Sequence, residues 1–291
     1  MIIIFLSVQG IAVACDACGC SIMGNPAGLL TQYKKNYLSL GWNRSGFNTA
    51  PGVGEGSVDV FHSFDISFQY YLASRWRVGL YQSYRLNTRE VNQTNQSIHG
   101  FSDTRFTADY TFFKKTSSDG FEIYLDIGTG ISLPTGKYDA HLHDQDLPEN
   151  FNPGNGSLGM GIQQTSSVSY QALGVVLKNS WTHYLKNNAD YTFGNQWAGN
   201  LLLFYNLPID STLSVLPMGG FQMENVNADI HPNGIEVDGT GGSGTFLSAG
   251  CQVKLNNWMC TFQYLVPLSD HYASGDVEAS QRFNVQLTHL F

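Results

Sequence analysis

Three cysteines near the N-terminus have the spacing of a ligand set for a soft metal ion. Cys15, Cys18 and Cys20 form a C-x-x-C-x-C pattern, and Met23 adds a thioether three residues later. Thiolate and thioether sulfurs are the ligands that Cu(I) prefers, and thiolates also bind zinc. The cluster therefore predicts a Cu(I) or zinc site. Two alternatives stay open at this point: acylation of Cys15, and a disulfide between two of the three cysteines.

The segment before the cluster predicts export of the protein. Residues 1–14 form an apolar run that ends in small residues, with Ala12 and Ala14 at positions −3 and −1 of a signal-peptidase site. We predict a signal peptide over residues 1–14, with a short buried strand as the alternative. A Cys-rich leader in the periplasm would then cover residues 15–35, and a folded domain would cover residues 36–291.

The composition points to an unusual class of β protein. Only 13% of the residues are charged, whereas soluble domains have about 25%. The mean hydropathy is nevertheless −0.15, and after residue 14 no apolar run reaches the roughly 18 residues of a membrane-spanning helix. The net charge of −8 argues against a nucleic-acid partner, because phosphates require clustered Lys and Arg.

Apolar and polar residues alternate along most of the chain after residue 36. Such a period of two predicts strands with one apolar and one polar face rather than helices. About twelve strands are predicted, over residues 36–47, 57–72, 75–89, 101–113, 121–133, 165–177, 180–190, 196–207, 212–224, 245–255, 258–267 and 280–291.

The links between these strands alternate in length as well. Short links are expected after every second strand, at Ala73-Ser74, Lys114–Gly120, Lys178-Asn179, Pro208–Ser211 and Asn256-Asn257. The other links are mostly longer. The longest spans residues 134–164, and a solvated acidic tip is expected there at His141, His143, Asp144 and Asp146, with a divalent metal site as the alternative. Short turns at one end and long loops at the other are typical of outer-membrane barrels. We therefore predict an all-β fold, a transmembrane antiparallel up-and-down β-barrel of about 12 strands in the bacterial outer membrane.

Aromatic residues fit this prediction. Trp76, Trp181 and Trp258 each lie within three residues of an expected short turn, where an interfacial aromatic girdle belongs. The last strand ends on Phe291, and a terminal aromatic residue resembles the signal that the barrel-assembly machinery reads. The lipid bilayer and that machinery are therefore the predicted partners.

The polar face of the early strands would line the barrel lumen. Its charged residues are Asp59, Asp65, Arg77, Arg85, Arg89, Asp103, Arg105, Asp109, Glu122 and Asp126. Acids and bases on neighbouring strands are expected to pair across the strands, whereas the later strands offer mostly neutral polar groups. Two interpretations remain: a selectivity wall for a polar solute, or a structural network that fills a narrow lumen.

The second pair of cysteines can be placed by hairpin geometry. If Asn256-Asn257 is a two-residue turn, Val253 faces Cys260 and Cys251 faces Phe262. Both cysteines then lie on the apolar outer face as diagonal neighbours, a position that favours free thiols over a disulfide.

An enzyme is not expected. Catalysis on a barrel would need a serine beside a histidine with an orienting partner. His62, His271 and Ser274 are the candidates considered, but no G-x-S-x-G sequence occurs, and nothing singles out a nucleophile.

Several motifs resemble a group of outer-membrane barrels from Bacteroidetes-type bacteria. The matching pieces are "CDACGCS", "GLLTQYKKNYLSLGW", "GTGISLPTGKY", "YTFGNQWAGNLLLFYNL", "DGTGGSGTFLSAG" and the terminal Phe. These barrels are known as transporters with an N-terminal CDxCGC motif and are distantly similar to the phenol-degradation meta-pathway barrel family. The resemblance implies a porin-like barrel that passes small molecules.

Two functions of different classes follow from the sequence. The first is a channel or transporter-like barrel that passes a small solute, such as an aromatic or hydrophobic compound or one related to metals. The second is a closed structural or metal-binding barrel that holds copper or zinc at the N-terminal cysteines.

Overall fold

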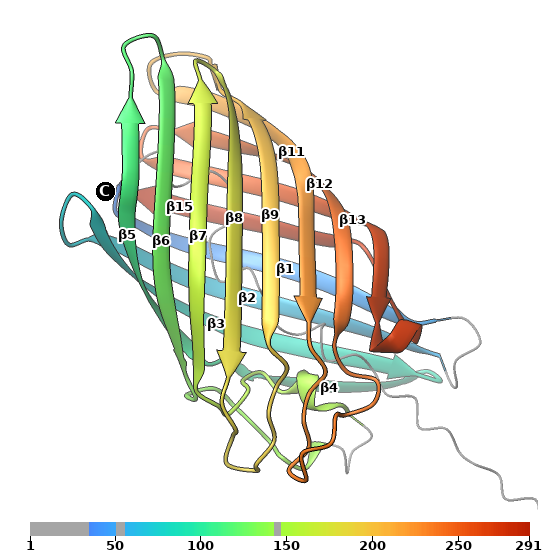
Figure 1. Ribbon diagram of the computed structural model, residues 1–291. Coiled ribbons are helices and arrows are strands. Elements are labelled where there is room, and N and C mark those ends of the chain that lie inside the picture. The colour runs from blue at the N-terminus through green and yellow to red at the C-terminus, as the bar shows by residue number, and fades with distance from the viewer. Residues whose placement is uncertain (1–34, 51–55, 143–146) are drawn as a thin grey trace, which may run out of the picture.

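The computed structural model describes residues 35–50, 56–142 and 147–291, which form mostly β-strands (Figure 1). The strands are β1 (Tyr37–Thr49), β2 (Ser57–Tyr71), β3 (Trp76–Val91), β4 (Thr94–Phe101), β5 (Thr104–Thr116), β6 (Phe121–Leu133), β7 (Gly159–Tyr170), β8 (Leu173–Tyr184), β9 (Gln196–Tyr205), β10 (Leu207–Pro208), β11 (Leu213–Val226), β12 (Gly242–Leu255), β13 (Trp258–Tyr272), β14 (Val277–Ala279) and β15 (Arg282–Leu290). Short 3-10 helices lie at η4 (Glu149–Phe151) and η5 (Ala273–Gly275). No helix in the described ranges is long and apolar enough to cross a bilayer.

Twelve antiparallel strand positions close into a barrel. Around the ring the order is β1, β2, β3, β5, β6, β7, β8, β9, β11, β12, β13 and β15. The last strand, β15, pairs with β13 on one side and with β1 on the other, where Tyr37 lies opposite Leu290. This pairing removes the open edges of the sheet. The closed twelve-stranded barrel confirms the predicted fold class.

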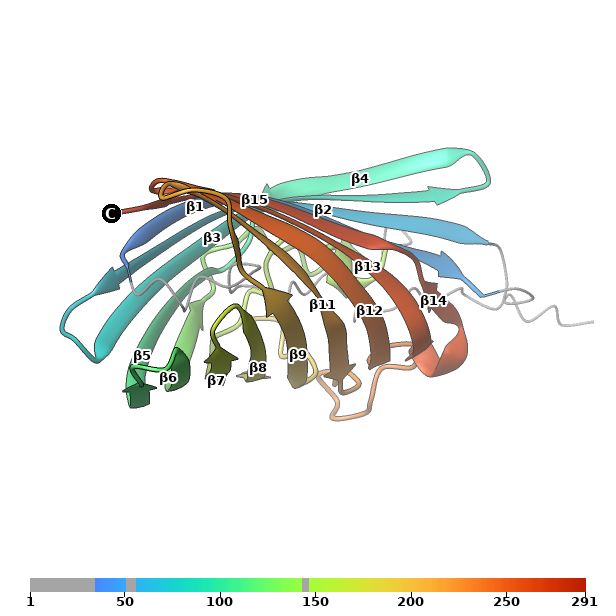
Figure 2. The same ribbon diagram turned by 90° about the horizontal axis from the view of Figure 1, so that it is seen from above.

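Three short strands extend the ring without adding a position to it. β4 pairs only with the far end of β3, and the two form a ribbon that projects beyond the other strands (Figure 2). β14 pairs with β1 and β13 just before β15 begins, and β10 pairs with β11 at the opposite end.

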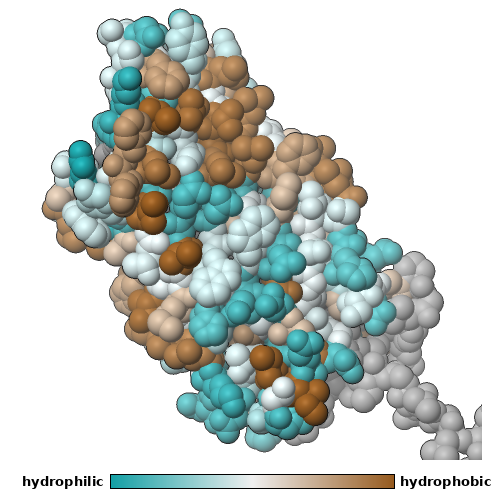
Figure 3. Space-filling model, in the orientation of Figure 1, coloured by the Kyte–Doolittle hydropathy of each residue, from teal (hydrophilic) through white to brown (hydrophobic). Residues whose placement is uncertain are grey.

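The alternation of residue types gives the barrel an apolar outside. On β2, for example, Phe64 and Ile66 are exposed whereas Ser63 and Ser67 are buried inside. Figure 3 shows apolar residues in a band across the upper part of the barrel, with polar residues concentrated below it. A closed sheet can cross hydrocarbon because all its backbone groups pair between strands. The belt of exposed apolar residues is therefore the surface that lipid would contact.

The hairpin turns at the short-turn end follow local backbone chemistry. Asn256 adopts a positive φ of 53°, which asparagine tolerates well. The predicted register is confirmed, since Val253 lies opposite Cys260 and Cys251 opposite Phe262. Both cysteines are free, as expected for diagonal neighbours on the outer face.

The predicted bounds of β7 and β8 were wrong. Strands were expected over residues 165–177 and 180–190 with a turn at Lys178-Asn179, but the turn lies at Gln171-Ala172 and Lys178 is inside β8. The reason is a polar patch in the apolar belt. Asn179 donates a hydrogen bond of 2.7 Å to Gln164, which in turn donates to Ser166. These outward amides hide the alternation that marks a strand.

The described parts of the segment between β6 and β7 pack into the long-loop end of the barrel. His141 of the expected acidic tip is exposed, and His143, Asp144 and Asp146 lie outside the described residues. Leu142, Leu147 and Phe151 of this segment are at most 3% exposed and join an apolar cluster with side chains of the barrel wall. The ring of Phe151 lies 5.0 Å from that of Phe61 on β2. Asn87 on β3 donates a 2.9 Å hydrogen bond to the carbonyl of Phe151. Three apolar side chains in an otherwise polar segment favour this inward position.

Candidate functional site

The charged residues predicted for the lumen face the barrel interior, with the exception of Glu122. Those on β2, β3, β5 and β6 share the inward side of their strands, and Asp103 lies between β4 and β5. Glu122 is exposed because it is the second residue of β6, past a register shift in the pairing of β5 with β6. It therefore belongs to the rim of the short-turn end and not to the interior.

The interior near the short turns contains a compact ionic network. Arg77 lies 3.2 Å from the carboxylate of Asp109, is ion-paired with Asp126, and donates a 2.8 Å hydrogen bond to the Tyr124 hydroxyl. Gln163 on β7 donates to the other oxygen of Asp109 at 2.7 Å. Buried charges need such partners because desolvation is costly. This network joins four neighbouring strands, β3, β5, β6 and β7.

A second ion pair lies near the long-loop end. Arg89 on β3 lies 3.6 Å from Asp59 on β2, and both side chains are nearly inaccessible. The Arg89 guanidinium also lies 3.4 Å from the Ser57 hydroxyl. The predicted cross-strand pairing of acids with bases thus holds at this position.

The opposite wall differs from the neutral polar surface that was expected. Arg282 on β15 makes a bidentate ion pair with Glu224 on β11, with two contacts of 2.8 Å. Tyr272 also donates to Glu224, and the guanidinium lies 4.0 Å from the Phe246 ring centroid. Glu224 alternates with outward Met223, so the period-two rule places it inside the barrel, but no sequence pattern identifies Arg282 as its partner.

The same wall also has an apolar inner surface. An interior cluster on β8, β9 and β11 consists of Val176, Leu202, Phe204, Leu216 and Met218. These side chains are buried while their neighbours on the same strands are exposed on the outside. Strands with apolar residues on both faces show no clear alternation, so the sequence pattern does not predict this inner cluster.

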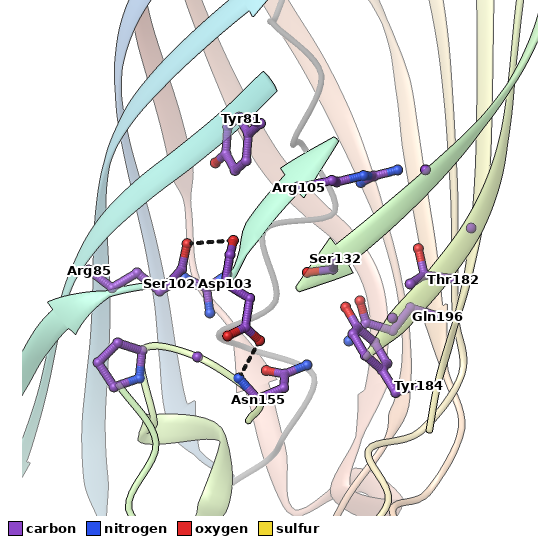
Figure 4. A pocket seen from close by; sticks show the side chains of 15 residues that line it. Tyr81, Arg85, Ser102, Asp103, Arg105, Ser132, Asn155, Thr182, Tyr184 and Gln196 are labelled. Atoms are coloured by element: carbon purple, nitrogen blue, oxygen red, sulfur yellow. Dashed lines mark hydrogen bonds between the residues drawn. The ribbon is translucent and has the colours of Figure 1, made fainter. Parts of the chain in front are cut away.

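A cavity lies against the charged wall, between the Arg77 network and the long-loop end. Its lining residues come from β3, β5, β6, β7, β8, β9 and the inward-folded segment: Tyr81, Arg85, Ser102, Asp103, Arg105, Gly130, Ser132, Pro153, Gly154, Asn155, Gly159, Gly161, Thr182, Tyr184 and Gln196. Figure 4 shows these side chains gathered from several strands around one space. The cavity brings together three of the predicted lumen residues, Arg85, Asp103 and Arg105.

Comparison with known proteins identifies the architecture. No protein-family model matches the sequence, and no curated protein matches it. Among solved structures, the chain is similar to an outer membrane channel from Pseudomonas putida F1. The TM-score is 0.65 and the identity 12%, over 88% of this chain and 96% of that chain. The chain is an outer-membrane β-barrel.

A second barrel has a similar fold. The β domain of the Bordetella autotransporter BrkA gives a TM-score of 0.53 at 10% identity, over 89% of this chain and 100% of that chain. At such identities the likeness concerns the fold alone. Together with the apolar belt, this fold locates the barrel in the bacterial outer membrane, in contact with lipid. The Bacteroidetes-type resemblance and the contact with the assembly machinery through Phe291 stay predictions.

The three tryptophans predicted for an aromatic girdle lie at two levels of the barrel. Trp76 and Trp258 begin β3 and β13 beside short turns. Trp181 does not lie near a short turn, contrary to prediction, because the true turn is at Gln171-Ala172. It lies instead toward the long-loop end of β8, opposite Trp197 on β9, and stacks on His183 with 6.1 Å between ring centroids. Membrane proteins place aromatic residues at both interfaces, so Trp181 fits the second girdle.

Other candidates can be placed only in part. Cys15, Cys18, Cys20 and Met23 lie outside the described residues, so copper or zinc binding there stays a prediction. Within the described ranges, no group of three or more His, Cys, Asp or Glu side chains could hold a metal ion.

The histidine considered for catalysis has a structural partner on the outer face. His62 accepts a 3.3 Å hydrogen bond from the indole of Trp42 and stacks on that ring.

In the segment between β6 and β7, burial raises the pKa of Tyr138, and the adjacent Glu149 raises it further. This phenol therefore stays protonated and serves as a neutral hydrogen-bonding group.

Proposed function

We propose that the barrel is an outer-membrane channel for a small solute. The observation that carries the proposal is the cavity inside the barrel, which is lined by charged, hydroxyl and amide side chains behind an apolar outer belt. A polar interior of this kind suits solutes that cannot cross hydrocarbon, and selectivity arises from the charges that line the path. The similar fold of the Pseudomonas protein, which is described as a channel, supports the proposal.

Reconstitution of the purified protein in planar lipid bilayers tests this function. We expect discrete conductance steps in KCl for the wild type and larger steps when the inward-folded segment is loosened. A matched preparation of heat-denatured protein controls for detergent leaks. Absence of conductance in the wild type, in Phe151→Ala and in a variant without residues 15–35 would exclude a channel.

A closed barrel is the second candidate function, and a specific observation favours it. The described parts of segment 134–158 place buried Leu142, Leu147 and Phe151 in the long-loop end of the interior, and ion pairs such as Arg77–Asp109 lie toward the short-turn end. A closed barrel would serve as a scaffold, with any metal bound at the N-terminal cysteines. Metal analysis of the wild type and of Cys18→Ser/Cys20→Ser tests whether these cysteines bind metal. Equal metal content in both proteins would eliminate the metal site.

A further inference from the structure

The interior arginines fall into two groups. Arg77, Arg89 and Arg282 each lie within 4 Å of a carboxylate. Arg85 and Arg105, which line the cavity, make no such ion pair with any residue in the described part of the chain. The buried Nε of Arg85 has no hydrogen-bond partner. Arginine stays protonated at all ordinary pH values, so the cavity wall carries two cations, and the charge of Arg85 also acts on Asp103 in the same wall.

The one carboxylate in the cavity wall is already engaged. The two oxygens of Asp103 accept hydrogen bonds from the backbone amides of Gly136 and Asn155, at 2.9 and 2.8 Å. Figure 4 shows the Asp103 carboxylate turned toward Asn155, and the Arg105 side chain extending away from it. Two guanidinium groups against one carboxylate leave the cavity with a net positive charge.

Glycines on the inner face make room for the Arg105 head group. A methyl group at Gly130 would lie 3.1 Å from Arg105 Nε, and one at Gly161 would lie 3.8 Å from an Nη of the same guanidinium. Arg105 itself makes one long hydrogen bond, 3.4 Å, to the Gln163 amide oxygen. Its remaining N–H donors can therefore turn to a ligand.

We propose that the cavity binds a small organic acid, whose carboxylate Arg105 holds while Arg85 adds positive charge to the same wall. Guanidinium groups bind carboxylates through charge-assisted, often bidentate, hydrogen bonds. Tyr81 and Tyr184 also line the cavity. The inference rests on the proposed channel function for the entry and exit of the acid, and it narrows the solute to an anion.

Equilibrium dialysis of the full-length protein in detergent tests the site without any need for conduction. The probe is benzoate, and benzamide is its neutral counterpart of the same shape. We expect benzoate to bind the wild type and benzamide to bind much more weakly. In Arg85→Gln/Arg105→Gln, benzoate binding should fall at least about tenfold, the factor that corresponds to about 1.4 kcal/mol. Equal benzoate binding by the wild type and this variant would overturn the proposal.

Matched variants separate charge from geometry. Arg44→Gln/Arg75→Gln removes the same charge away from the interior, since Arg75 is exposed at a turn and Arg44 lies on the outer side of β1, and should bind benzoate like the wild type. Arg85→Lys/Arg105→Lys keeps the charge but loses the planar fork, and should bind benzoate less tightly than the wild type. It also serves if the glutamine variant fails to fold.

Reversal potentials in a KCl gradient test the role of the cavity arginines separately from the channel function. The wild type should prefer chloride to potassium, and Arg85→Gln/Arg105→Gln should lose that preference. Wild-type binding of benzoate without conductance would contradict the channel and leave the site intact. Conductance with the same ion preference in both proteins would contradict the site and leave the channel intact.

Discussion

Arg77 and Arg85 lie on the same face of β3, about 26 Å apart along the strand at the usual rise per residue, yet their surroundings differ. Arg77 is held by two carboxylates and a phenol from neighbouring strands. Arg85 faces the cavity and has no carboxylate within ion-pairing distance among the described residues. The comparison indicates that the Arg77 network uses its charges to hold strands together, whereas the cavity leaves cationic charge available.

The largest effect is expected from Arg77→Met. Removal of the guanidinium leaves Asp109 and Asp126 buried without their shared cation, which should lower the free energy of unfolding by about 3–5 kcal/mol. Urea unfolding in lipid vesicles, followed by tryptophan fluorescence, measures the change. Arg75→Met at the exposed turn is the matched control. A loss as small as that of the control would mean that the network does not stabilise the barrel.

A somewhat smaller loss is expected from Arg282→Met on the opposite wall. This substitution leaves one buried carboxylate, Glu224, without its cation. Because Glu224 retains its hydrogen bond from Tyr272, the free energy of unfolding should fall by about 3 kcal/mol. The double variant Arg282→Met/Glu224→Leu should recover most of that loss in the same unfolding assay. If the double variant is no more stable than the single one, the pair is not the source of the effect.

Phe151→Ala should loosen the segment that fills the long-loop end. A Phe→Ala change in a core costs about 3–5 kcal/mol. We expect a smaller loss here, because this segment can move away without opening the ring of strands. Single-channel conductance should rise in planar bilayers, while the ion preference set by the cavity arginines should be kept. Unchanged conductance would show that the segment does not limit passage.

The smallest effect on stability is expected from Arg85→Met. No carboxylate depends on this guanidinium for an ion pair, so the free energy of unfolding should change by less than about 1 kcal/mol. The same substitution at Arg77 supplies the contrast within one strand. A loss at Arg85 as large as that at Arg77 would mean that both arginines stabilise the barrel to the same degree.

The sequence predicted the parts of the barrel in which the side chains alternate cleanly. Strand β6 has the predicted bounds, and the hairpin at Asn256-Asn257 has the predicted register, because each of these strands has one apolar and one polar face. The prediction failed at β7 and β8, where Gln164 and Asn179 place amides in the lipid-facing belt. Local alternation is a side effect of burial, so it disappears wherever both faces carry similar residues.

The site was predictable only as a set of inward positions. Period two places Arg77 and Arg85 on the same face, but it cannot tell which of them finds a carboxylate on the next strand. That depends on register and on the path of segment 134–158, which supplies the backbone amides for Asp103. Contacts of this kind join residues far apart in the chain, and single-sequence patterns do not record them.

Closure of the ring has a consequence for the order of events in biogenesis. The hydroxyls of Ser39 and Thr288, 249 positions apart in the chain, meet at 2.6 Å across the seam between β1 and β15. Such non-local contacts form late and slow folding. Until β15 is in place, β1 and β13 would each present a bare hydrogen-bonding edge that invites aggregation. Pairing of the last strand is therefore the step that removes both edges from the assembling barrel.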